Sequence, residues 1–136
     1  MSGIEQEPMR NIMSLEIEAA GKLLTNACHG AAVKGGWWHD LETGEKLDRN
    51  AGEMFALIHS EISEALEGHR KNKQDDHLPH RPSIEVELAD AVIRICDMAG
   101  GFGLDLGGAL AEKMAYNARR ADHKPENRRK SDGKKY

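Results

Sequence analysis

Two pairs of carboxylates are the residues in this sequence best suited to chemistry. The first pair is Glu61 and Glu64, and the second pair, after 22 intervening residues, is Glu87 and Asp90. Each pair has i,i+3 spacing, which places both side chains on one face of a helix. Like charges at this distance repel one another unless a cation lies between them. The two pairs therefore predict a site for Mg²⁺, which binds a few carboxylates and leaves other positions for water and phosphate.

The second pair lies in a segment, residues 83–101, that is apolar on most sides. A helix of this kind is normally buried. One charged stripe runs along it at helical spacing, made of Glu87, Asp90, Arg94 and Asp97. Burying ions is costly unless they are paired or bind a metal. The stripe therefore favours a binding site over a solvated face, and Arg94 is expected to pair with Asp90 or Asp97.

Two other metal sites fit the sequence less well. A di-iron four-helix bundle needs Glu-x-x-His motifs, and the sequence contains none. His77 and His80 lie in a Pro-containing stretch without cysteine partners, so they are expected to be surface residues rather than zinc ligands. Oxygen ligands also suit Mn²⁺, so the choice between Mg²⁺ and Mn²⁺ stays open.

The composition indicates a single helical domain. With 136 residues and only 4% aromatic residues, the chain favours helix packing over a β-sandwich. The sequence contains no apolar run long enough for a membrane span and no signal-peptide pattern at its start. Cys28 and Cys96 lie within helical patterns and are interpreted as reduced core residues. A cytoplasmic location is therefore expected.

Four helices are predicted from the apolar periodicity, at residues 8–34, 50–71, 83–101 and 105–121. Pro8 suits a first turn, and Asn50, Ser83 and Asp105 are the expected N-caps of the later helices. The core-facing stripe of the second helix is expected to consist of Met54, Ile58, Ile62 and Leu66.

The charge is divided unevenly along the chain. The net charge is −4, yet residues 119–136 carry eight Lys or Arg against three Asp or Glu. Residues 124–136 are therefore expected to form a basic, flexible tail that follows a domain of residues 1–123. The tail could also be an arm that holds polyphosphate or nucleic acid.

Two further groups of residues are candidates for holding a nucleotide. Lys113, Asn117 and Arg120 share one helical stripe, which favours contact with phosphate. Trp37 and Trp38 are the only tryptophans, and they either pack at an interface or offer a surface on which a base can stack.

Together these motifs resemble the MazG-like, all-α nucleoside triphosphate pyrophosphohydrolases, over roughly residues 12–123. The segments 57–67 and 87–94 resemble the two metal-binding helices of this family, and Lys113, Asn117 and Arg120 resemble its phosphate-holding element. Residues 34–38 resemble the stretch near the base in the short phage and bacterial subgroup. The basic end after His123 departs from the pattern.

The resemblance implies a bundle of about four helices with the metal helices at its centre, completed by homo-oligomerisation into a dimer or a dimer of dimers. It also implies conversion of a nucleoside triphosphate to the monophosphate and pyrophosphate, with a weak preference for a deoxypurine such as dGTP. In this interpretation Glu61, Glu64, Glu87 and Asp90 are catalytic and hold two or three Mg²⁺ ions. Trp37, Trp38 and His29 border the base. A dUTP- or phosphoribosyl-ATP-directed relative would share the chemistry.

An interpretation from a different class also remains. The chain could be a non-catalytic helical module that binds nucleic acid through its basic tail, with a strong dependence on salt and no need for Mg²⁺. This alternative leaves the charged stripe in residues 83–101 unexplained.

Overall fold

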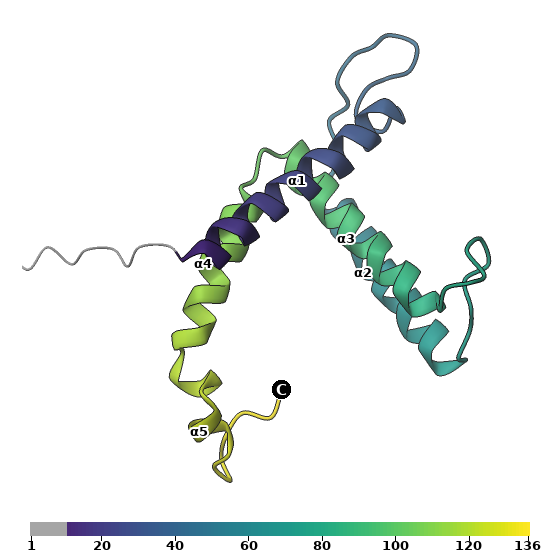
Figure 1. The fold of residues 1–136 in the computed structure, drawn as a ribbon. Helices are drawn as coiled ribbons and strands as arrows, with labels where there is room; N and C mark the ends of the chain where they lie inside the picture. Colours follow the sequence, from purple (N-terminus) through teal and green to yellow (C-terminus); the bar gives the residue numbers. More distant parts are fainter. Residues whose placement is uncertain (1–10) are drawn as a thin grey trace, which may run out of the picture. The chain divides into compact units, whose positions relative to one another are not determined.

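The structure is a computed structural model that describes residues 11–136. In this part of the chain the regular secondary structure is helical, and loops connect the helices. The helices are α1 (Ile12–Lys34), α2 (Ala51–Arg70), α3 (Ser83–Gly101), α4 (Leu106–Arg119) and α5 (Pro125–Arg128), with a 3-10 turn η1 (Ala121–His123) before α5 (Figure 1). Residues 11–136 contain isolated β-bridges but no strand. The predicted all-α class is confirmed. Pro8, the predicted start of the first helix, lies outside the described residues.

The chain divides into two compact units. Residues 24–104 form one, which we call the metal-helix unit because it contains both carboxylate pairs. Residues 11–23 together with residues 105–136 form the other, which we call the α4 unit. The predicted boundary at residue 123 falls between η1 and α5, inside the α4 unit.

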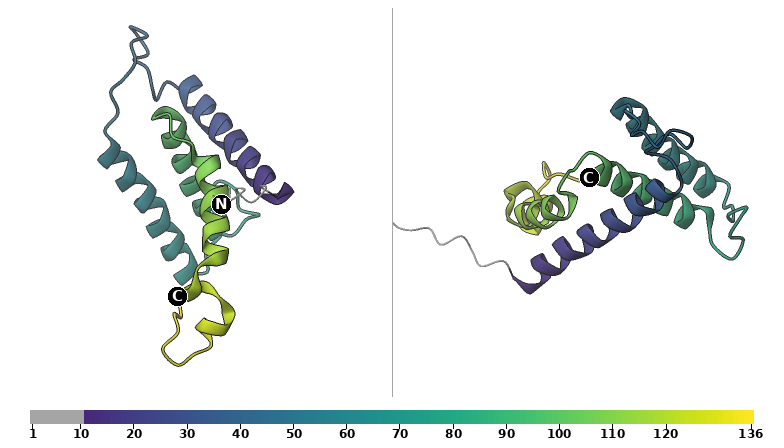
Figure 2. Two further views of the ribbon diagram at one scale, coloured as in Figure 1. Left: turned by 90° about the vertical axis from the view of Figure 1, so that its left-hand side faces the viewer. Right: turned by 90° about the horizontal axis from the view of Figure 1, so that it is seen from above.

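In the metal-helix unit, α2 and α3 form an antiparallel pair (Figure 2). Asn50 caps α2 as predicted, because its side-chain oxygen accepts a hydrogen bond from the Glu53 N–H at 3.0 Å. At the far end of the pair, a Cβ at Gly68 would overlap the Ser83 side chain, so only glycine permits this approach of the two helices. The pairing therefore brings the middle of α2 against the middle of α3, where the carboxylates lie.

The core of this unit differs from the predicted stripe. Trp38, Met54 and Met98 form the buried cluster, with partly buried Ile58 beside it. Ile62 and Leu66, which were expected in the core, are exposed. The expected N-cap of α3 is also wrong by one residue, since Pro82 is the cap and Ser83 is the first helical residue, buried against α2.

The α4 unit is held together where α1 and α4 cross. A Cβ at Gly21 would overlap the backbone of Gly107, and a Cβ at Gly107 would overlap the Glu18 carbonyl oxygen. Two glycines therefore let the helix backbones touch. Asp105 caps α4 as predicted, accepting from the Gly108 N–H at 3.0 Å. The helix ends at Arg119, two residues before the predicted end.

Among the described residues, no helix combines the length and the hydropathy that a bilayer span requires.

Candidate metal centre

Three of the four predicted carboxylates meet in the metal-helix unit. Glu61 projects from α2, and Glu87 and Asp90 project from α3. One oxygen of each of these side chains lies within 4.8 Å of the other two. Glu61 is buried, and Glu87 and Asp90 are partly buried. The i,i+3 spacing placed each pair on one face, and the antiparallel pairing of α2 and α3 turns those faces toward one another.

Glu87 is the most perturbed member of this cluster. Burial, followed by its contacts with the Glu61 and Glu64 carboxyl groups, raises the pKa of Glu87 to about 7. Its Oε2 atom is buried, and no hydrogen-bond donor among the described residues reaches it. A buried acceptor without a donor is costly, and a proton or a metal ion can relieve that cost. Glu64 is exposed, but it is close enough to Glu87 to contribute to this effect.

Asp90 is perturbed in the same direction. Burial and the nearby Glu61 charge raise its pKa, Arg94 opposes them, and Asp75 adds a smaller upward effect. Asp75 lies in the loop between α2 and α3 and was not among the predicted site residues. The negative charge around Asp90 therefore comes from α2 and from the loop that joins α2 to α3.

Arg94 pairs with a different carboxylate from those expected. Its Nε atom donates to Glu61 Oε1 at 2.8 Å, from α3 to α2, rather than pairing with Asp90 or Asp97 of its own helix. The spacing along α3 revealed that Arg94 shares a stripe with those aspartates. It could not reveal that the Glu61 side chain of the neighbouring helix lies closer.

A cavity of about 620 Å³ adjoins the cluster. Its walls include Glu61, Asp90, Arg94, Arg49 and Trp37, and α1 contributes small side chains such as Ala31 and Ala32. This volume lies within the usual range of small-molecule sites, roughly 300–1,000 Å³. Arg49 was not predicted as a site residue, because it lies in a loop without any helical spacing that would connect it to the others.

The three predicted base-binding residues have different positions. Trp37 is 65% exposed and lines the cavity. Trp38 is only 2% exposed, and its Nε1 donates to Asp97 Oδ1 at 2.8 Å. His29 Nδ1 donates to the same oxygen at 3.0 Å, and its ring meets the Trp38 ring edge-on. Trp38 and His29 are therefore engaged with Asp97, and Trp37 is the one of the three with a face toward the cavity.

The predicted phosphate residues lie in the α4 unit. Lys113 Nζ lies 4.7 Å and Arg120 Cζ 5.9 Å from the centre of the Tyr116 ring, so both cations lie near the same aromatic ring. The Asn117 Oδ1 atom is buried without a hydrogen-bond partner among the described residues. Lys113 and Asn117 therefore lie on α4 as predicted, whereas Arg120, predicted on the same helical stripe, is the extended residue just after the end of α4.

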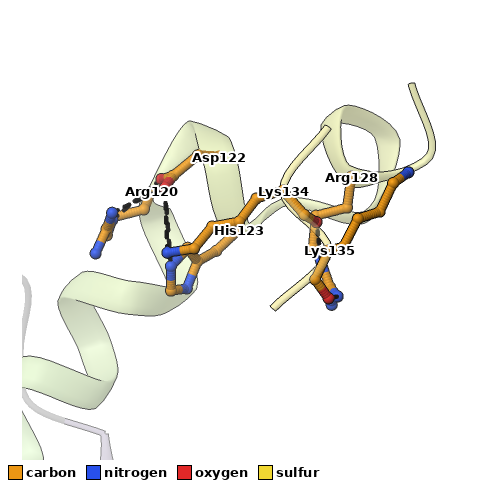
Figure 3. Close-up of polar contacts among 6 residues, drawn as sticks. All are labelled: Arg120, Asp122, His123, Arg128, Lys134 and Lys135. Atoms are coloured by element: carbon orange, nitrogen blue, oxygen red, sulfur yellow. Dashed lines mark hydrogen bonds and ion pairs between the residues drawn. The ribbon is translucent and has the colours of Figure 1, made fainter. Parts of the chain in front are cut away.

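Arg120 also takes part in a set of ion pairs after α4 (Figure 3). Its guanidinium donates to Asp122 at 2.8 and 3.1 Å, and Lys134 Nζ lies 3.9 Å from the same carboxylate. The Arg128 guanidinium donates to the Lys134 and Lys135 carbonyl oxygens, which folds the end of the chain back on α5. A single carboxylate therefore organises several cations here, and these arginines and lysines retain a net positive charge.

Comparison with known proteins identifies no relative. No family model, no curated protein and no solved structure matches the chain.

Proposed function

We propose that this chain is a Mg²⁺-dependent nucleoside triphosphate pyrophosphohydrolase of the MazG-like, all-α type. The observation that carries the proposal is the meeting of Glu61, Glu87 and Asp90 within 4.8 Å beside a cavity of about 620 Å³. Three carboxylates this close repel one another when ionised, and a divalent cation between them would relieve that repulsion. A cavity beside them has room for the substrate that the cation would serve.

The donors present fit a hard divalent cation. All three are carboxylate oxygens, and Glu87 Oε2 is buried with no donor reaching it from the described residues. Glu64, next to Glu87, is a fourth donor close by. Such oxygen-only sets bind Mg²⁺ or Mn²⁺ rather than zinc, which prefers nitrogen and sulfur. When bound, the ion would neutralise phosphate charge and lower the pKa of a water molecule.

The reaction assigns a task to each group of residues. Water adds to a phosphorus atom, the bond from phosphorus to the bridging oxygen breaks, and the monophosphate and pyrophosphate separate. Glu61 or Glu64 accepts the proton of that water as a general base. Lys113, Asn117 and Arg120 donate to phosphate oxygens and stabilise the charge that develops on the departing group. Trp37, with its exposed face at the cavity, stacks on the base.

We further propose that the chain forms a homo-oligomer in the cytoplasm. Exposed apolar side chains support this, because α2 exposes Phe55, Ile62 and Leu66 and α3 exposes Leu88 and Val92. Single chains rarely expose so many large apolar groups on neighbouring helices. Light scattering after size-exclusion chromatography is expected to give a dimer or tetramer, which Leu66→Glu reduces to monomer. Leu78→Glu, in the loop between α2 and α3, is the matched control and is expected to leave the assembly unchanged.

The activity is tested with a hydrolysis panel of the eight common ribo- and deoxynucleoside triphosphates with Mg²⁺, followed by ion-exchange separation of products. The proposal predicts monophosphate and pyrophosphate from one or two substrates, dGTP among them. Diphosphate and phosphate would overturn the reaction while leaving the metal centre in place. Absence of hydrolysis with Mg²⁺ and Mn²⁺, combined with salt-dependent DNA binding that is lost on deletion after His123, would support the helical interaction module instead.

A further inference from the structure

Arg94 is the cation that compensates the carboxylate cluster in this structure. Its Nε atom donates to Glu61 Oε1 at 2.8 Å, and its charge also opposes the upward pKa shift of Asp90. The two partners are exposed to very different degrees, since the Glu61 side chain is 10% exposed and the Arg94 side chain 42%. One end of this ion pair is therefore fixed inside the cluster, and the other end borders solvent.

The bond to Arg94 occupies an oxygen of Glu61, the one carboxylate of the three that is buried. Glu61 is the ligand that α2 contributes to the group of three, so an ion held between α2 and α3 needs its carboxylate. A guanidinium and a divalent cation compete for the same lone pairs, and their like charges repel at this distance. Arg94 and the metal ion would thus compete for the Glu61 carboxylate.

We propose that Arg94 is an exchangeable counter-ion of the metal centre. It pairs with Glu61 while the centre is empty, yields that carboxylate to the incoming ion, and then presents its guanidinium to a phosphate group in the cavity. This inference rests on the proposed function, because it takes the cluster to be a metal site and the occupant of the cavity to be anionic.

The surroundings of Arg94 permit this exchange. Arg94 lines the cavity together with Trp37 and Arg49, so a turn of its long side chain keeps it at the cavity wall. A second arginine at the same wall makes the cavity suited to a phosphorylated ligand. The planar guanidinium fork matches phosphate oxygens as well as it matches a carboxylate. Asp97, by contrast, is held by the buried Trp38 indole, which has no comparable freedom.

Metal affinity gives the first test, because a competitor and a structural support have opposite effects. Mn²⁺ binding is measured by electron paramagnetic resonance at pH 8.5 on the unmodified protein, Arg94→Met and Arg94→Lys. Arg94→Met is expected to bind Mn²⁺ about fivefold more tightly, since a charge-assisted hydrogen bond no longer has to be broken. Arg81→Met is the control and is expected to leave the affinity unchanged, because it removes only the exposed ion pair between Arg81, just before α3, and Glu85 in the first turn of α3.

Nucleotide affinity gives the second test. With saturating Mg²⁺, an α,β-methylene nucleoside triphosphate is expected to bind about tenfold more weakly to Arg94→Met. The exchange therefore predicts two opposite changes in Arg94→Met, tighter Mn²⁺ binding and weaker nucleotide binding. Weaker Mn²⁺ binding in Arg94→Met would overturn the proposal, because it would mean that Arg94 holds Glu61 in place for the metal. Unchanged nucleotide binding would overturn the phosphate contact.

The lysine variant keeps the test decisive if Arg94→Met does not fold. Lysine retains the charge but lacks the planar fork, so Mn²⁺ affinity is expected to stay within about twofold while nucleotide affinity falls. A several-fold loss of Mn²⁺ affinity in Arg94→Lys would contradict the exchange. Failure of the proposed function looks different, because the unmodified protein would then bind no Mn²⁺ at all.

Discussion

Two clusters of charged residues look alike in the sequence and differ in the structure. The cluster of α2 and α3 contains a buried carboxylate, and its partly buried neighbours have raised pKa values beside a cavity. The cluster after α4 is built around Asp122, whose pKa its hydrogen bond to Arg120 lowers. In the first, like charges are forced together, and in the second, opposite charges meet near solvent.

The difference shows which stripe of charges indicates a site. An exposed network of opposite charges satisfies itself and contributes little energy. A partly buried group of like charges is unfavourable by itself, so it indicates a candidate cation site. Under the proposed function, Lys113 and Arg120 of the α4 unit would bind the negative charges of a substrate.

Removing one ligand is the largest expected effect. Asp90→Asn keeps the shape of the side chain but removes its charge, so hydrolysis is expected to fall by a factor of about 10³ or more. Helical circular dichroism should be unchanged. Glu85→Gln, an exposed carboxylate on the same helix, is the control and should retain full activity. Equal activity in both variants would contradict the claim that the partly buried Asp90, and not the exposed Glu85, belongs to the site.

The α4 stripe is tested next, with a smaller effect. Lys113→Gln is expected to raise the KM for the triphosphate about tenfold through the loss of a charge-assisted contact. Mn²⁺ affinity should not change, because Lys113 is not one of the carboxylates of the proposed metal site. Lys22→Gln, which removes the ion pair of the exposed Lys22 with Glu18 in the α4 unit, is the matched control. A parallel loss of Mn²⁺ affinity in Lys113→Gln would contradict the division of tasks between the two clusters.

Asp97 is a further buried carboxylate, and the Trp38 indole and the His29 imidazole are its hydrogen-bond partners. Trp38→Phe removes the indole donor and leaves His29 in place. The variant is expected to lower the Tm by about 4 °C, the effect of losing one buried hydrogen bond. Mn²⁺ affinity should stay within about twofold of the unmodified value. A large loss of Mn²⁺ binding would show that Asp97 belongs to the metal centre after all.

The raised pKa of Glu87 predicts the smallest effect. A carboxyl group whose pKa is raised in the folded protein stabilises the fold at low pH, and that contribution is lost as pH rises toward and through about 7. The metal-free protein is therefore expected to lose about 2 °C of Tm between pH 5.5 and 8 through this group. Glu87→Gln should remove that loss. Mg²⁺ should restore the Tm at pH 8 in the unmodified protein but much less in Glu87→Gln.

Local sequence rules predicted the helices and the shared face of each carboxylate pair, but not the side-chain pairing between helices. The caps at Asn50 and Asp105 follow from side chains that bond to the next turn, and they are confirmed. The i,i+3 carboxylates could be assigned to one face because helical geometry is local. The pairing of Arg94 with Glu61 could not be predicted, since 33 residues separate them.

Burial was harder to predict than helical position. Met54, Ile58, Ile62 and Leu66 share one helical stripe. Met54 and Ile58 lie in or against the core cluster, whereas Ile62 and Leu66 are exposed. Trp37 and Trp38 are neighbours in sequence, and the turn that follows α1 buries one ring and exposes the other. Such differences depend on which elements meet, and spacing along one helix does not contain that information.

The most direct test of the metal centre is an anomalous difference map from a crystal soaked in Mn²⁺ above pH 8. We expect a strong peak in contact with Glu61, Glu87 and Asp90, with the Arg94 guanidinium moved away from Glu61. A map without a peak at these carboxylates, in which Arg94 still pairs with Glu61, would contradict the account.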